Sequence, residues 1–187
     1  METTKKPKNR KTVKNDQKIK TNFEMMKLLL PMYRNRLDQP EQLRVFYGQF
    51  RNSIFDTTNT KEFKIGFISL AARNALASGV SKTNFTSDHV IRRIHGVAYL
   101  FHVLNSNPNM GYRTFKKHLK EVGQQVLLTH REHQLVNQFT RRTDKNNVEV
   151  YNELAIEVVG YHKKGRPKVW TRYVQNKIMN IYRQLGI

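Results

Sequence analysis

A short apolar segment that runs directly into a helix-start signature constrains the fold of this chain more than any other feature. Residues 125–128 are apolar after the first position and are too short for a helix, which predicts a buried strand. Thr129-His130-Arg131-Glu132 then matches a capping box, in which the Thr hydroxyl and the Glu carboxylate satisfy free N–H groups of a first helical turn. The sequence therefore predicts a strand leading into a helix, with His133 in the first turn of that helix.

The remaining apolar residues recur mostly at helical spacing. Their pattern predicts helices from residue 23 to the region of Pro31 and over 41–56, 60–77, 90–104, 112–122, 149–154 and 171–185. One further short strand is expected at 156–159. The predicted fold class is α+β, mainly α-helical, with a small β-containing core.

Composition divides the chain into four segments. Residues 1–21 carry eight Lys or Arg and almost no apolar side chain, so we expect a disordered basic tail. A helical region is expected over 22–80, the core with the strand–helix unit over 81–162, and a basic segment with a final helix over 163–187.

The charge of the chain indicates a polyanionic partner. Lys and Arg number 34 against 14 acidic residues, a net charge of +20, which favours nucleic acid as the partner. The basic residues are spread along the chain instead of lining one amphipathic helix, so no membrane partner is expected. There is no cysteine and no apolar leader at the N-terminus, and we expect an intracellular protein.

An adjacent carboxylate and imidazole, Asp88-His89, precede the strand–helix unit. Phosphodiester hydrolysis needs a base for the attacking water and a cation for the charge that develops on the phosphate. A histidine can serve as the base near neutral pH, and a carboxylate with one further ligand can hold the cation. If this segment is extended, however, the two side chains point to opposite faces.

Together these residues resemble the HNH nucleases, whose core is a ββα-metal fold. That family has Asp-His, then an Asn, an apolar run, and a His or Asn nine residues after the first Asn. This chain has Asp88-His89, then Gln124, an apolar run, and His133 nine positions after Gln124. It looks most like HNH-like and homing-type proteins of bacteriophages, over residues 81–159.

The resemblance implies a role for each matching residue. Asp88 and His133 would be metal ligands, His89 the general base, and Gln124 the residue that orients the base. Gln124 departs from the family Asn, and the segment between His89 and residue 126 is longer and more helical than usual. The implied metal is Mg²⁺ or Mn²⁺, and a histidine ligand also admits Zn²⁺ or Ni²⁺. A phage-encoded enzyme would act in the cytoplasm of its bacterial host.

The C-terminal segment adds candidates for DNA contacts. The run 163–168 is similar to the Gly-Arg-Pro core of AT-hooks, which places Lys163, Lys164, Arg166 and Lys168 in a minor groove; a basic linker is the alternative interpretation. Arg92 and Arg93, directly after the Asp-His pair, are further candidates. Helical spacing from Trp170 to Ile181 indicates either core or a homodimer surface.

The sequence thus predicts a metal-dependent DNA endonuclease that acts on double-stranded DNA and needs no small-molecule substrate. A non-catalytic DNA-binding protein with a degenerate core is the alternative, which Gln124 keeps open. An RNA-binding or structural protein is a third hypothesis that the charge alone would support.

Two further polar residues lie close to His133 in the sequence. His130 is expected at the surface, and Asn137, one turn after His133, is either a surface residue or a further ligand.

Overall fold

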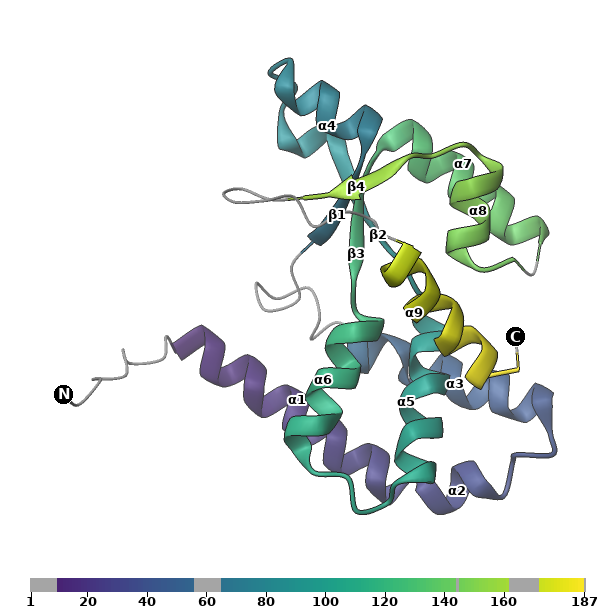
Figure 1. The fold of residues 1–187 in the computed structure, drawn as a ribbon. Helices are drawn as coiled ribbons and strands as arrows, with labels where there is room; N and C mark the ends of the chain where they lie inside the picture. Colours follow the sequence, from purple (N-terminus) through teal and green to yellow (C-terminus); the bar gives the residue numbers. More distant parts are fainter. Residues whose placement is uncertain (1–9, 56–64, 144, 162–171, 187) are drawn as a thin grey trace.

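The computed structural model describes residues 10–55, 65–143, 145–161 and 172–186, which form a helical part and a sheet part (Figure 1). The helical part contains α1 (Arg10–Leu28), α2 (Leu30–Arg34), α3 (Pro40–Phe55), α5 (Arg93–Ser106) and α6 (Tyr112–Val122). The sheet part contains β1 (Ile65–Ser69), β2 (Phe85–His89), β3 (Gln125–Thr129) and β4 (Val158–Gly160), with α4 (Leu70–Ala77), α7 (His130–Arg142) and α8 (Asn147–Glu153). Helix α9 (Arg172–Gln184) packs on α5. The fold is α+β and mainly helical, as predicted.

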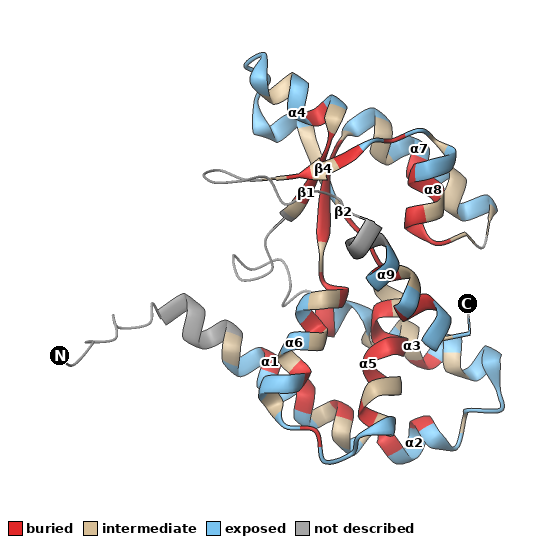
Figure 2. Cartoon of the chain, in the orientation of Figure 1, coloured by how far each residue is buried: buried red, intermediate tan, exposed pale blue. Residues whose placement is uncertain are grey.

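Helix α5 is the centre of the helical part. It is buried along most of its length and packs against α2, α3, α6 and α9 (Figure 2). Its close contact with α3 depends on Gly96, because a Cβ at that position would lie 2.5 Å from a ring carbon of Phe55. Aromatic rings fill the neighbouring space, with Phe101 5.3 Å from Tyr33 and 5.0 Å from Phe46 between ring centroids.

The sheet has the strand order β2-β3-β1-β4 and mixed direction. Strand β3 pairs antiparallel with β2 and parallel with β1, and β4 pairs antiparallel with β1. The long segment between β2 and β3 is filled by α5 and α6, so two strands that are distant in sequence become neighbours. The order β2, β3, α7 gives an antiparallel strand pair followed directly by a helix.

Strand register determines which residues share a face of the sheet. Asp88 pairs with Val126 and His89 with Gln125, and paired residues of antiparallel strands lie on the same face. The face with Val126 and Leu128 belongs to the main core with Val136 of α7 and Tyr151 of α8. The opposite face carries the small cluster of Ile68, Ala72 and Leu127 beside α4.

Two expectations from the sequence are wrong. Within the predicted helix over 60–77, residues 65–69 instead form strand β1 and residues 70–77 form α4, because a short apolar run such as Phe67-Ile68 is buried between β3 and β4 in a central strand. Residues 10–21, expected in the disordered tail, form the first part of α1. Ile19 is fully buried, and Asp16 accepts a hydrogen bond from Tyr112 and pairs with Lys116, so this turn of α1 is held by α6.

The local predictions around the strand–helix unit are confirmed. Strand β3 spans 125–129, α7 begins at the predicted cap, and α6 has the predicted bounds. Helix α7 continues to Arg142. Among the described segments, no helix is both long enough and apolar enough to cross a membrane.

Candidate active site

The end of β2 separates the two residues of the Asp88-His89 pair. Because β2 is extended through His89, the two side chains point to opposite faces of the sheet. Asp88 lies on the face covered by α7 and α8, whereas the ring of His89 lies on the other face beside Gln125. The structure therefore brings Asp88 together with His133, but not with the ring of His89.

Helix α7 is aimed at this site by its N-terminal cap. Thr129 accepts a hydrogen bond from the main-chain N–H of Glu132 (3.2 Å), and the Glu132 carboxylate accepts from the main-chain N–H of Thr129 (2.9 Å). The fully buried Ser69 donates to the same carboxylate (2.6 Å). From this start α7 runs back over β2, and His130 Nδ1 lies 2.9 Å from Thr86 Oγ1. The following turns then pass over Asp88.

These turns and the end of β2 enclose a pocket of about 390 Å³. The pocket is lined by Ser87, Asp88, His89, Arg92, Arg93, His133, Val136, Asn137, Thr140 and Asn147. Two arginines and one carboxylate line it, so its charge favours an anionic ligand.

Asp88 is a half-buried carboxylate held by α8. Its Oδ2 accepts a hydrogen bond from the hydroxyl of Tyr151 (2.7 Å) and faces the amide nitrogen of Asn147 at 3.4 Å. Burial raises the pKa of Asp88, while the hydrogen bond from Tyr151 and the nearby charge of His133 oppose that rise. Within the described ranges Asp88 forms no ion pair. A carboxylate in this setting is stabilised by a positive charge in the pocket.

His133 and Asn137 are one turn apart on α7 and both line the pocket. The amide nitrogen of Asn137 is 3.3 Å from both ring nitrogens of His133. An atom in the ring plane and equally far from both nitrogens would collide with Cε1, so the amide lies over the ring. The imidazole has no other hydrogen-bond partner among the described residues. His133 is half-buried and Asn137 is exposed.

The two adjacent arginines differ in their contacts. The Nη2 of Arg92 donates to the carbonyl oxygen of Thr140 near the C-terminal end of α7 (3.3 Å) and to that of Lys145 in the turn after it (2.7 Å). Arg92 is therefore already engaged in holding α7. Arg93 also lines the pocket, and its side chain has no hydrogen bond or ion pair with the part of the chain that the structure describes. Arg93 is thus the arginine that remains available to a ligand.

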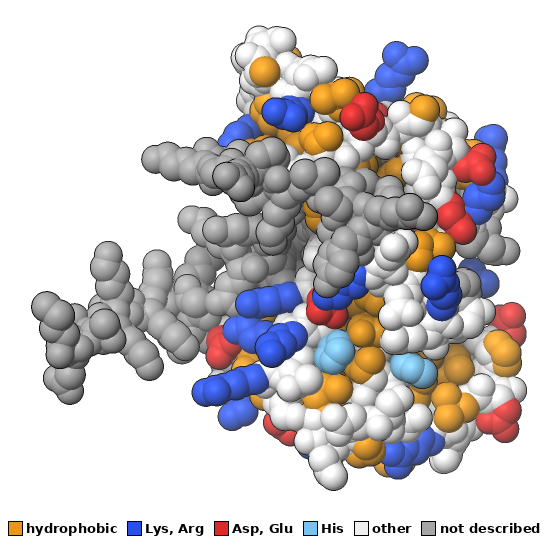
Figure 3. Space-filling view, viewed as in Figure 1, with side chains coloured by type: hydrophobic (Ala, Val, Ile, Leu, Met, Phe, Trp, Pro, Cys, Tyr) orange, Lys and Arg blue, Asp and Glu red, His pale blue; other side chains and the backbone are white. Residues whose placement is uncertain are grey.

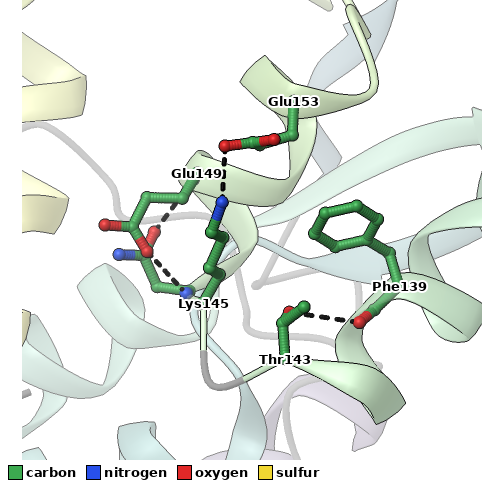
Figure 4. A network of polar contacts seen from close by, with 6 residues as sticks. Phe139, Thr143, Lys145, Glu149 and Glu153 are labelled. Carbon is green, nitrogen blue, oxygen red and sulfur yellow. Dashed lines mark hydrogen bonds and ion pairs between the residues drawn. The ribbon is translucent and has the colours of Figure 1, made fainter.

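A network of polar contacts holds the turn between α7 and α8 (Figure 4). Lys145 donates to Glu153 (2.5 Å) and lies over the ring of Phe139, and Thr143 donates back to the Phe139 carbonyl (3.1 Å). Asn146 then caps α8 in a second capping box with Glu149. This cap fixes the start of α8, so that Asn147 in its first turn reaches Asp88.

His89 is a core residue in this structure. It is 7% exposed, its ring meets Phe55 edge-on at 5.3 Å, and its Nε2 is 3.3 Å from the Gln125 amide nitrogen. Burial, together with the charge of Arg93, lowers the pKa of His89 to about 4. Its Nδ1 is buried without a hydrogen-bond partner among the described residues.

Gln124 does not line the pocket. Its carbonyl accepts a hydrogen bond from the main-chain N–H of Val90 (3.0 Å), which ties the start of β3 to the end of β2. The glutamine whose side chain reaches His89 is the next residue, Gln125. The other candidates for DNA contacts, Lys163, Lys164, Arg166 and Lys168, lie outside the described residues.

Sequence reasoning missed Asn147 and Tyr151. Both come from α8, about sixty residues after Asp88, and their contact with Asp88 depends on tertiary structure. The Asn146–Glu149 capping box is a local signal that the helix begins before the predicted residue 149. No comparison of the chain with protein-family models, curated proteins or solved structures finds a match. The functional argument therefore depends on the residues of this pocket.

Proposed function

We propose that this protein is a metal-dependent endonuclease that hydrolyses phosphodiester bonds of double-stranded DNA. The observation that carries the proposal is the convergence of Asp88 and His133, from separate segments of the chain, on one pocket that Arg93 also lines. The net charge of +20 supports a polyanionic substrate. Lys and Arg side chains occur over both parts of the molecule, with several gathered over α6 and α1 (Figure 3).

The donor set of the pocket fits a divalent cation. Asp88 offers a carboxylate without an ion pair among the described residues, His133 an imidazole, and Asn137 an amide oxygen. Only the first two belong to the usual metal-binding types, and no group of three such residues occurs in the described segments. A bound Mg²⁺ or Mn²⁺ would supply positive charge to the scissile phosphate and lower the pKa of a bound water. Zn²⁺ or Ni²⁺ would also suit a histidine ligand.

Arg93 would bind a non-bridging oxygen of the phosphate. Arg93 lines the pocket and has no hydrogen bond or ion pair among the described residues, and arginine binds phosphate in a fork geometry. Arg92 would act indirectly, because its guanidinium holds the end of α7 that carries His133 and Asn137. The two arginines thus divide substrate binding from support of the site.

The general-base role implied for His89 requires a movement. In the present arrangement the ring packs against Phe55 on the far side of β2, so reaching a water in the pocket requires rotation of the side chain out of the core. A histidine with a pKa near 4 is neutral at pH 7 and has a free lone pair, but it is a weaker base than an ordinary histidine.

The position of His89 favours a second candidate, a non-catalytic DNA-binding protein. In that case the pocket binds a phosphate of the DNA backbone without cleaving it, and the packed His89 ring and Gln124 are remnants of a degenerate core. Both candidates are proposed to act in the cell interior, in the host cytoplasm if the chain is encoded by a phage.

Nicking of supercoiled plasmid DNA with Mg²⁺ or Mn²⁺ distinguishes the candidates. The full-length protein should nick the plasmid only with the metal, and Asp88→Ala and His133→Ala should both lose that activity. The exposed His130, replaced by Ala, is the matched control. Metal-dependent DNA binding without nicking would support the second candidate. Nicking that is equal in all four proteins would reject the enzyme proposal.

A further inference from the structure

Helix α8 contributes two side chains to the buried side of Asp88. Asn147 and Tyr151 are one turn apart on α8, are 4% and 2% exposed, and both have a polar atom near Asp88 Oδ2. A tyrosine hydroxyl beside a carboxylate can only donate, so the 2.7 Å contact from Tyr151 fixes one side of the carboxylate.

The orientation of the Asn147 amide is fixed by the main chain. Its Nδ2 donates to the carbonyl oxygen of His89 at 2.5 Å, and the reversed amide would place two acceptors together at that distance. The same nitrogen therefore faces Asp88 Oδ2, and one amide connects the carboxylate to the end of β2. Asn147 Oδ1 is buried with no hydrogen-bond partner among the described residues. A buried acceptor of this kind, in a residue that lines the pocket, indicates a bound water or cation.

Helix α9 supports this arrangement from behind. The Tyr182 hydroxyl accepts a hydrogen bond from the main-chain N–H of Arg92 (3.4 Å). Burial raises the pKa of Tyr182 to about 12, and main-chain hydrogen bonds from Arg92 and Asn147 oppose that rise. The amide of Asn146, next to Asn147, faces the sulfur of Met179 on α9 (3.7 Å). The position of Asn147 is thus fixed by α8 and α9 together.

We propose that Asn147 and Tyr151 are positioning residues that hold the Asp88 carboxylate in one orientation for a divalent cation in the pocket. This inference rests on the proposed function, since it assigns a purpose to the hydrogen bonds behind the proposed metal ligand. Neutral donors suit this task, because they orient the carboxylate without supplying the full positive charge that would compete with a cation. A lysine or arginine in their place would neutralise Asp88 itself.

The test measures Mn²⁺ affinity of the full-length protein without DNA, by titration calorimetry or by the electron paramagnetic resonance signal of free Mn²⁺. Tyr151→Phe keeps the buried ring and removes only the hydroxyl, and Asn147→Ala removes the amide. Each should weaken Mn²⁺ binding about 10- to 100-fold, the usual effect of losing a residue that supports a metal ligand. The Mn²⁺ concentration at half-maximal nicking should rise by the same factor, with a smaller change in the rate at saturating Mn²⁺.

Matched controls exist in the helical part. Tyr33→Phe also removes a hydroxyl from a buried ring, and Asn22→Ala removes a buried amide whose Nδ2 donates to the Ser53 carbonyl (3.0 Å). Both should leave Mn²⁺ affinity unchanged, which separates positioning from general loss of stability. If Asn147→Ala does not fold, Tyr151→Phe alone decides.

Two failures are distinguishable in this experiment. Native Mn²⁺ affinity in Tyr151→Phe, combined with loss of binding in Asp88→Ala, would overturn the positioning roles and leave the proposed metal site intact. Absence of Mn²⁺ binding in the native protein would reject the metal site, and the positioning roles with it, before any variant is compared.

Discussion

The two faces of strand β2 at residues 88 and 89 differ in what they offer a ligand. On the Asp88 side a half-buried carboxylate lies beside a polar pocket with His133 and Arg93. On the His89 side the imidazole packs against Phe55 and Gln125 in the core. Strand geometry alone therefore places these adjacent residues in different surroundings, Asp88 beside the pocket and His89 in the core.

The largest expected effect is a difference in nicking activity between a variant of Asp88 and a variant of His89. Asp88→Asn should reduce Mn²⁺-dependent nicking about 1,000-fold, because several kcal/mol of charge stabilisation by the cation would be lost. The same variant should keep or increase the free energy of unfolding, because burial of the Asp88 charge is unfavourable. His89→Leu, in contrast, should retain nicking within about tenfold. If His89→Leu instead loses nicking as completely as Asp88→Asn and remains folded, the ring turns into the pocket during catalysis.

The free energy of unfolding, measured as a function of pH, should detect the burial of His89. The pKa of His89 falls from 6.5 in the unfolded chain to about 4 in the folded protein, so the unfolded state takes up a proton first as pH decreases. The contribution of His89 to the free energy of unfolding is then full above pH 6.5 and declines toward pH 4, by about 3 kcal/mol. His95, half-buried against Tyr182, also has a pKa lowered to about 4 and adds to this decline.

Denaturant unfolding at pH 7 and pH 5 measures this effect. His89→Leu should reduce the difference between the two pH values, and His130→Gln at the exposed start of α7 is the control. An unchanged difference in His89→Leu would show that His89 is not protected from protonation in the folded protein.

Substitutions of the adjacent arginines Arg92 and Arg93 should have effects of intermediate size. Arg92→Ala should lower the free energy of unfolding by about 2 kcal/mol, because charged hydrogen bonds to the carbonyls of Thr140 and Lys145 are lost. Arg93→Ala should change stability by no more than about 0.5 kcal/mol and should weaken DNA binding with a smaller salt dependence. Chemical denaturation and DNA binding at two salt concentrations measure both quantities. Equal effects of the two substitutions on stability would contradict the division of roles.

The smallest effect concerns the cap that directs α7. Thr129→Ala should cost about 1 kcal/mol, since the main-chain N–H of Glu132 loses its acceptor. Thr129→Ser keeps the hydroxyl and should recover most of that loss, as measured by thermal unfolding. A full loss in the Ser variant would show that the methyl group of Thr129, and not the cap, supports the helix.

Local patterns could be predicted from the sequence, whereas contacts between distant segments could not. The capping box fixed the start of α7 and hence the place of His133, because cap and helix are adjacent in the chain. The same reasoning failed at β1, where a short apolar run is compatible with helix and strand. The roles of Gln125, Asn147 and Tyr151 depend on strand register and on the contact of α8 with the end of β2, and neither property is visible in a local pattern.

The measurement that tests the account most directly is a crystal structure of the protein with Mn²⁺, using anomalous scattering to locate the ion. For the proposed metal site we predict one strong peak in the pocket, at coordination distance from the Asp88 carboxylate and the His133 ring. The hydroxyl of Tyr151 should still donate its hydrogen bond to Asp88. No peak at that position, or a peak beside His89 on the other face of β2, would contradict the proposed metal site.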